Sequence, residues 1–152
     1  MSRTCYSVAM WRCALLAISV SATVGYAQVD PPIRERLTAA LGDTAAVTRF
    51  LSRWSLFASD SERLRFVDRR PSAAGPLGHR IVQEMDIDSS SSTLIRFEVS
   101  CESGHMRARR VVLYSDRAAR HVASIDSVPE DWSTARPSPS DANAVLVTKA
   151  CG

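Results

Sequence analysis

A change in the spacing of apolar residues at Trp54 constrains the fold of this chain more than any other feature. Before it, Ile33, Leu37 and Leu41 recur at the spacing of one helix face. After it, apolar and polar residues alternate in short runs separated by turn residues, which is typical of half-buried strands. Successive strands joined by short turns pair antiparallel. The sequence therefore predicts an α+β fold, with a helical N-terminal segment and an antiparallel meander.

Several segments after the helical one show the strand pattern. They cover residues 54–58, 63–68, 80–87, 95–101, 106–114 and 121–125. The alternation is clearest in the fourth of them. Its core face is expected to carry Ile95, Phe97, Val99 and Cys101. Its solvent face is expected to carry Arg96, Glu98 and Ser100. A slip of one residue would bury the charges, so this register is strongly specified.

Helices are expected at both ends of the meander. The first segment, 32–53, is interrupted by a glycine and forms one broken helix or two short ones, with Asp43 or Thr44 capping the second part. A closing helix is expected over 141–150, with Ser140 as its cap. Because Cys101 is predicted to point into the core, a bond to the last helix would tie that helix to the inner face of the sheet.

The first 27 residues have the three parts of a secretory signal peptide. Arg3 and Arg12 provide a charged start, a short apolar run follows, and small residues precede a cleavage site after Ala27. A membrane anchor is the alternative, but a spanning helix needs roughly 20 apolar residues and this run is shorter and broken by serines. The mature chain is expected to begin at Gln28, without stable membrane insertion.

This interpretation divides the chain into three parts. They are a signal peptide (1–27), an N-terminal helical segment (28–53) and an antiparallel β domain with a C-terminal helix (54–152). Removing the two signal arginines lowers the formal net charge from +3 to near +1. So small an excess gives no support to nucleic-acid binding.

The cysteines point to a disulfide and to an oxidising compartment. Cys5 and Cys13 lie in the predicted signal, which leaves Cys101 and Cys151 in the mature chain. An even number of cysteines in an exported chain favours a disulfide. Two separate thiols with other roles, such as metal binding, are the alternative, although zinc-ligand pairs usually lie two to four residues apart. The expected location is periplasmic or secreted.

No residue pattern assigns a reaction. The histidines, His79, His105 and His121, are far apart and match no zinc-ligand spacing. There is no Gly-x-Ser-x-Gly nucleophile turn and no glycine-rich phosphate loop. We therefore assign no catalytic residue, metal ligand or cofactor, and expect a non-catalytic binding domain. A small periplasmic hydrolase or metal-dependent enzyme remains the alternative.

Arginines supply the candidate binding surface. If the segments ending at Cys101 and beginning at Met106 form a hairpin, Arg96, Arg107 and Arg109 lie on its solvent face. Such a stripe could hold an anionic partner. The alternative is an ordinary solvated face, with nearby acidic residues such as Glu98 between the arginines.

The order of elements from Trp54 to Cys151 resembles the surface-adhesin protein E-like family of small exported bacterial domains. The shared features are an opening tryptophan, a strand closing on aspartate, a strand ending in cysteine, an arginine-rich strand ending in tyrosine, and a tail with tryptophan, Pro-x-Ser and a helix ending in cysteine. They correspond here to Trp54, 64–68, 95–101, 106–114, Trp132, 137–140 and Cys151.

That resemblance implies a strongly curved antiparallel sheet with a C-terminal helix tied by a disulfide. The member that gives the family its name binds host matrix proteins and can dimerise, which implies a protein partner and a homodimer here. This chain departs from that member in lacking a lipid-anchor cysteine and in carrying the additional segment 32–53. The resemblance therefore supports an expectation about the fold more strongly than one about the activity.

Overall fold

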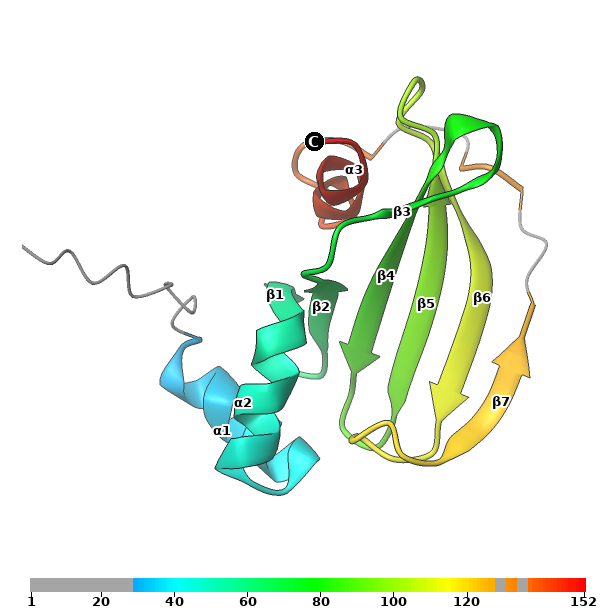
Figure 1. The fold of residues 1–152 in the computed structure, drawn as a ribbon. Coiled ribbons are helices and arrows are strands. Elements are labelled where there is room, and N and C mark those ends of the chain that lie inside the picture. Colours follow the sequence, from blue (N-terminus) through cyan, green and yellow to red (C-terminus); the bar gives the residue numbers. More distant parts are fainter. Residues whose placement is uncertain (1–28, 128–130, 134–136) are drawn as a thin grey trace, which may run out of the picture.

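The computed structural model describes residues 29–127, 131–133 and 137–152. The predicted signal peptide and its cleavage site lie outside these residues. Two helices precede a seven-stranded antiparallel sheet, and a third helix closes the chain (Figure 1). The long strands are visibly bowed in Figure 1. The predicted α+β fold is confirmed.

The N-terminal segment forms two helices, α1 (Pro31–Leu41) and α2 (Thr44–Arg53). Gly42 ends α1 with a φ of 101°, a left-handed conformation that glycine adopts without steric cost. Asp43 begins α2, and its side chain accepts a hydrogen bond of 2.6 Å from the amide of Ala46. The interruption seen in the sequence is therefore a tight connection between two helices.

The strands follow one another as a meander. Their bounds are β1 (Trp54–Ser59), β2 (Leu64–Asp68), β3 (Ala73–Ala74), β4 (Arg80–Ile87), β5 (Ser92–Val99), β6 (Met106–Tyr114) and β7 (Val122–Asp126). The spatial order is β1-β2-β4-β5-β6-β7, and the short β3 pairs with the beginning of β4. A single 3₁₀ turn, η1 (Pro76–Gly78), connects β3 to β4.

Each face of the sheet is covered at a different place. The helices α1 and α2 form a helical hairpin that packs on one side of the sheet, and we call this side the hairpin face. It buries Phe66, Met85 and Ile87 against Leu37 and Val47 of the two helices. The opposite side, here called the α3 face, is covered by the helix α3 (Ala144–Cys151). Its core consists of Val67, Val82, Val99, Met106, Leu146, Val147 and Ala150.

The predicted disulfide is present but its location differs from the prediction. Cys101 and Cys151 are bonded, with their Cα atoms 5.4 Å apart. The strand ends at Val99, and the next residues form a turn closed by a bond of 2.7 Å from the Gly104 amide to the Ser100 carbonyl. Cys101 is therefore exposed on this turn, and the prediction that it points into the core was wrong. The bond ties the end of α3 to the β5–β6 turn.

The closing helix also begins later than predicted, at Ala144 instead of 141. Turns precede it, in which the Asp141 amide donates to the Ser138 carbonyl and the Ala144 amide donates to the Asp141 carbonyl, both at 2.9 Å. Ser140 is therefore not its cap.

Two carboxylates at the centre of the sheet are buried, and one of them, Glu98, was predicted to lie on a solvent face. Glu84 on β4 is 1% exposed on the α3 face and accepts a 2.5 Å hydrogen bond from Arg65. Glu98 on β5 is 0% exposed on the hairpin face. Alternation tells the two faces of a strand apart, but it does not show that both are covered.

The disulfide indicates an oxidising environment, because such bonds persist outside reducing compartments. Among the described residues, no helix is both long and apolar enough to cross a membrane.

Candidate functional site

A β-bulge gathers arginines on the hairpin face between β5 and β6. Arg96 on β5 lies directly opposite Arg110 on β6. Between the pairs Arg96–Arg110 and Phe97–Ala108, the register shifts and β6 contains one extra residue, Arg109. A bulge of this kind sets two residues of one strand against one of its partner. Arg109 and Arg110 of β6 therefore both reach the same side of the sheet as Arg96.

These arginines line a hollow of about 340 Å³ on the hairpin face. Its walls include Arg96, Arg109 and Arg110, with Glu98 and Ile81 beside them. We call this hollow the arginine trough. A second hollow, also of about 340 Å³, shares Arg96 and Ile81 with it and continues toward β2. The two hollows adjoin at these residues, and together we call them the depression.

Glu98 is the acidic centre of the trough. Its Oε2 is 3.0 Å from the Arg107 guanidinium and 3.5 Å from that of Arg109, and its Oε1 is 2.7 Å from Nδ1 of His79. Burial favours the neutral acid, but hydrogen bonds from His79 and Arg107 and the charges of both arginines outweigh it, so the pKa of Glu98 lies below its ordinary value. Glu98 is therefore a buried anion held by cationic neighbours.

Arg107 is further packed by an aromatic ring. Its guanidinium lies 4.4 Å from the ring centroid of Trp132, and that ring contacts the His79 imidazole edge to face at 4.8 Å. Its side chain is only 23% exposed. Arg107 therefore stabilises Glu98 and the packing around it.

Arg96 and Arg110 differ from Arg107 in having no counter-ion. Within the described residues, neither side chain makes an ion pair or a hydrogen bond, and both residues are exposed. Like charges placed directly opposite each other across two strands destabilise the pair. These two adjacent positive charges are therefore not compensated by any residue that the structure describes.

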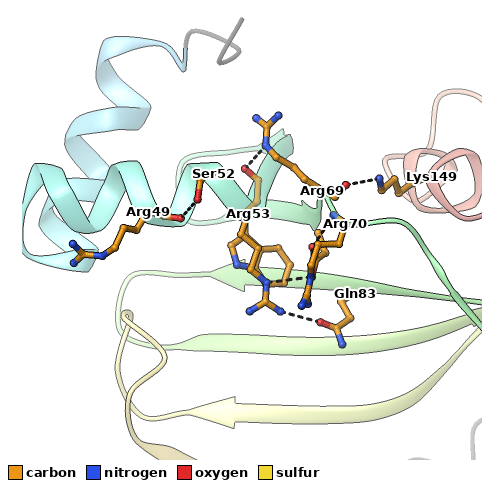
Figure 2. A network of polar contacts seen from close by, with 9 residues as sticks. Arg49, Ser52, Arg53, Arg69, Arg70, Gln83 and Lys149 are labelled. Carbon is orange, nitrogen blue, oxygen red and sulfur yellow. Dashed lines mark hydrogen bonds and ion pairs between the residues drawn. The ribbon is translucent and has the colours of Figure 1, made fainter. Parts of the chain in front are cut away.

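A second ionic cluster lies at the β2 end of the depression (Figure 2). Asp68 accepts hydrogen bonds from Arg53 at 3.2 Å and Arg70 at 2.6 Å, and Arg53 also donates to Gln83 at 3.3 Å. Burial acts to raise the pKa of Asp68, but Arg70 and Arg53 overcome it and lower that pKa. The arginines of this cluster have an anion between them, unlike Arg96 and Arg110.

Another hollow, of about 680 Å³, lies between α3 and strands β1 and β2. Arg69 lines it and donates to the main-chain carbonyl of Trp54, while Lys149 donates to the Arg69 carbonyl (Figure 2). Both basic residues therefore have partners, and this hollow lacks the unpaired charges that mark the trough.

The structure places the three predicted surface residues together but gives them different environments. Arg96 is exposed, Arg109 is 46% exposed and bound to Glu98, and Arg107 is mostly buried. Arg110 was missed. Strict alternation would have put its charge on the buried side with Met106 and Ala108, and this conflict in the sequence is the signal that could have revealed the bulge.

The histidines lie apart from one another. His79 contacts Glu98, whereas His121 lies 3.1 Å from Asp116 on an exposed turn. In the part of the chain that the structure describes, no group of three or more His, Cys, Asp or Glu side chains is arranged to hold a metal ion.

The candidate site thus rests on the geometry of the trough. The resemblance to the surface-adhesin protein E-like family stays a prediction. No family model matches the chain, and no curated protein or solved structure matches it either.

Proposed function

We propose that the protein is an exported, non-catalytic binding domain that holds an anionic partner in the arginine trough. The observation that carries this proposal is the cross-strand pair of Arg96 and Arg110, which has no counter-ion within the described residues. An anion placed between the two guanidinium groups would replace their repulsion by attraction. The partner therefore supplies the charge that the fold leaves out.

Export to an oxidising compartment agrees with the presence of the disulfide. The disulfide between Cys101 and Cys151 requires an oxidising compartment to persist. The signal-like residues 1–27 supply a route to such a compartment. Both features favour a periplasmic or secreted protein.

A hydrolase would be the second candidate, and the pairing of His79 with Glu98 is the observation in its favour. A carboxylate that orients an imidazole is one part of a catalytic triad. Among the described residues, however, no Ser, Thr or Cys side chain hydrogen-bonds to His79, and Glu98 is also bound by Arg107. The same pair has a structural use, because it helps to hold the buried Glu98.

The proposal is tested by capture from the exported fraction of the native cell. The bait proteins are the wild type, R96Q/R110Q, and the control R34Q/R49Q, which has the same net charge. Arg34 and Arg49 are exposed on α1 and α2, far along the chain from the trough. We expect the wild type and the control to retain a partner that R96Q/R110Q loses. Raising the salt concentration should release it, because exposed charges are screened.

A partner retained equally by all three proteins would contradict the proposal and place the working surface elsewhere. Hydrolysis of a general ester or phosphodiester substrate, lost in H79Q but not in R96Q/R110Q, would contradict it in favour of the enzyme.

A further inference from the structure

We infer that the arginine trough is a site for a tetrahedral dianion, the phosphate or sulfate group of an ester. This inference rests on the proposed function, since it names the group by which the anionic partner is recognised. Arg96, Arg109 and Arg110 would bind its oxygens.

The charge balance of the trough calls for more than one negative charge. Arg96, Arg109 and Arg110 line the trough, and Arg107 lies beside it, whereas Glu98 is the single carboxylate among the described lining residues. Arg107 is committed to that carboxylate by a bond of 3.0 Å and by its contact with Trp132. One bound carboxylate would therefore leave two of these positive charges without a counter-charge, whereas a dianion would leave only one.

The arrangement of the donors also suits a tetrahedral group. Residues directly opposite across antiparallel strands have Cβ atoms about 5 Å apart, so Arg96 and Arg110 extend from neighbouring points. The bulge adds Arg109 beside them, and its contact with Glu98 is the longest of that cluster at 3.5 Å. Guanidinium groups bind phosphate oxygens through paired N–H donors. Three residues with such groups, from two strands, line the same hollow.

The space around the donors has room for an ester as well as for a free ion. The trough has a volume of about 340 Å³, and the adjoining hollow toward β2 has the same volume. Gln83 lines that second hollow, and while its amide oxygen accepts from Arg53, its amide nitrogen can donate to hydroxyl groups. A phosphate or sulfate held at Arg96 could therefore carry a polar, sugar-sized group directed toward Gln83.

Isothermal titration of the full exported chain at constant ionic strength tests this site. The probes are inorganic phosphate and acetate at about pH 7.5, where phosphate is largely a dianion because its second pKa is about 6–7. We expect the wild type and R34Q/R49Q to bind phosphate within twofold of each other, and R96Q/R110Q to bind it at least tenfold more weakly. Acetate should bind at least tenfold more weakly than phosphate.

The variant R96K/R110K separates recognition by paired donors from attraction by charge alone. It keeps both charges but loses the planar donor pairs, so we expect phosphate binding several times weaker than in the wild type. Circular dichroism melting verifies that each variant is folded. A hexose 1-phosphate identifies the source: tighter binding than phosphate supports an ester, and equal binding supports the free ion.

Three results would overturn the inference: no phosphate binding by the wild type, equal binding by R96Q/R110Q, or equal binding of acetate and phosphate. If phosphate fails to bind but R96Q/R110Q still loses the captured partner, the dianion site is wrong and the proposed function stands. If phosphate binds as expected while every bait retains the same partner, the proposed function fails and the dianion site stands.

Discussion

Two arginines that look alike in the sequence have opposite roles at the scale of single residues. Arg107 covers a buried carboxylate and packs on Trp132, whereas Arg96 has no partner among the described residues. The difference follows from Glu98, which is fully buried and must be compensated where it lies. A buried anion of this kind orders its neighbouring cations and leaves the more distant ones available to a ligand.

Replacing Arg107 should therefore destabilise the protein, and replacing Arg96 should not. Arg107→Gln weakens the compensation of a buried charge, so we expect a loss of about 1–3 kcal/mol, reduced because His79 and Arg109 remain. Arg96→Gln should change stability by no more than about 0.5 kcal/mol. Urea denaturation monitored by circular dichroism measures both.

The double variant E98Q/R107Q is the control for this comparison. It removes the buried charge with its partner, so it should be more stable than R107Q alone. Equal unfolding free energies for R96Q and R107Q would show that Glu98 does not depend on Arg107.

The β4–β5 turn shows at the scale of elements how one carboxylate organises a serine-rich segment. Asp88 accepts hydrogen bonds of 2.7 Å from the amides of Ser90 and Ser91 and from the Ser91 hydroxyl. Partial burial acts to raise the pKa of Asp88, but these bonds outweigh it and lower the pKa from 3.8 to about 2. The turn between two central strands is thus held by an ionised side chain.

This pKa predicts a loss of stability in acid. A carboxyl group with a lowered folded-state pKa stabilises the fold above its unfolded pKa, near 3.8, and this stabilisation disappears as the pH falls toward about 2. The melting temperature of the wild type should therefore fall more steeply over this pH range than that of Asp88→Asn. The variant keeps a side-chain acceptor but does not ionise. Melting curves from pH 5 to pH 2 measure the difference. Parallel curves would mean that other carboxyl groups dominate the acid response.

The elements themselves were largely predictable. The bounds of β6, Met106–Tyr114, were predictable because the turns that flank it carry clear signals. The location of Cys101 was not predictable, because it depends on the turn that follows β5. The burial of Glu98 was not predictable either, because it depends on what covers that face of the sheet. The trough needed the bulge at Arg109, which shifts the pairing of β6 with β5 and so brings Arg110 to the site.

At the scale of the whole molecule, the described residues form a sheet with helices on opposite faces, and the disulfide ties the last helix to the β5–β6 turn. The cores under the α1–α2 hairpin and under α3 are separate groups of side chains. The disulfide joins residues 50 positions apart, so it encloses β6, β7 and α3 in one loop. The stability of that half of the fold is therefore coupled to the redox state.

Removing the bond should destabilise the protein strongly. In the chain-entropy model, opening a loop of this length costs about 4 kcal/mol, because the unfolded chain gains freedom. Cys101 and Cys151 are both exposed, so the replacement C101S/C151S creates no buried polar group. Melting of the wild type with and without reductant, compared with this variant, measures the effect. An unchanged melting temperature on reduction would show that the bond contributes little.

The position of the second cysteine, one residue before Gly152, also decides how the molecule would carry mechanical load. Tension applied between α1 and Gly152 passes along the chain to β5, crosses the sulfur atoms from Cys101 to Cys151, and leaves at Gly152. The loop between the cysteines is hidden length, on the order of 170 Å when fully extended. While the bond is intact, β1 to β5 bear the force, and β6, which carries the trough residues Arg109 and Arg110, is left unloaded.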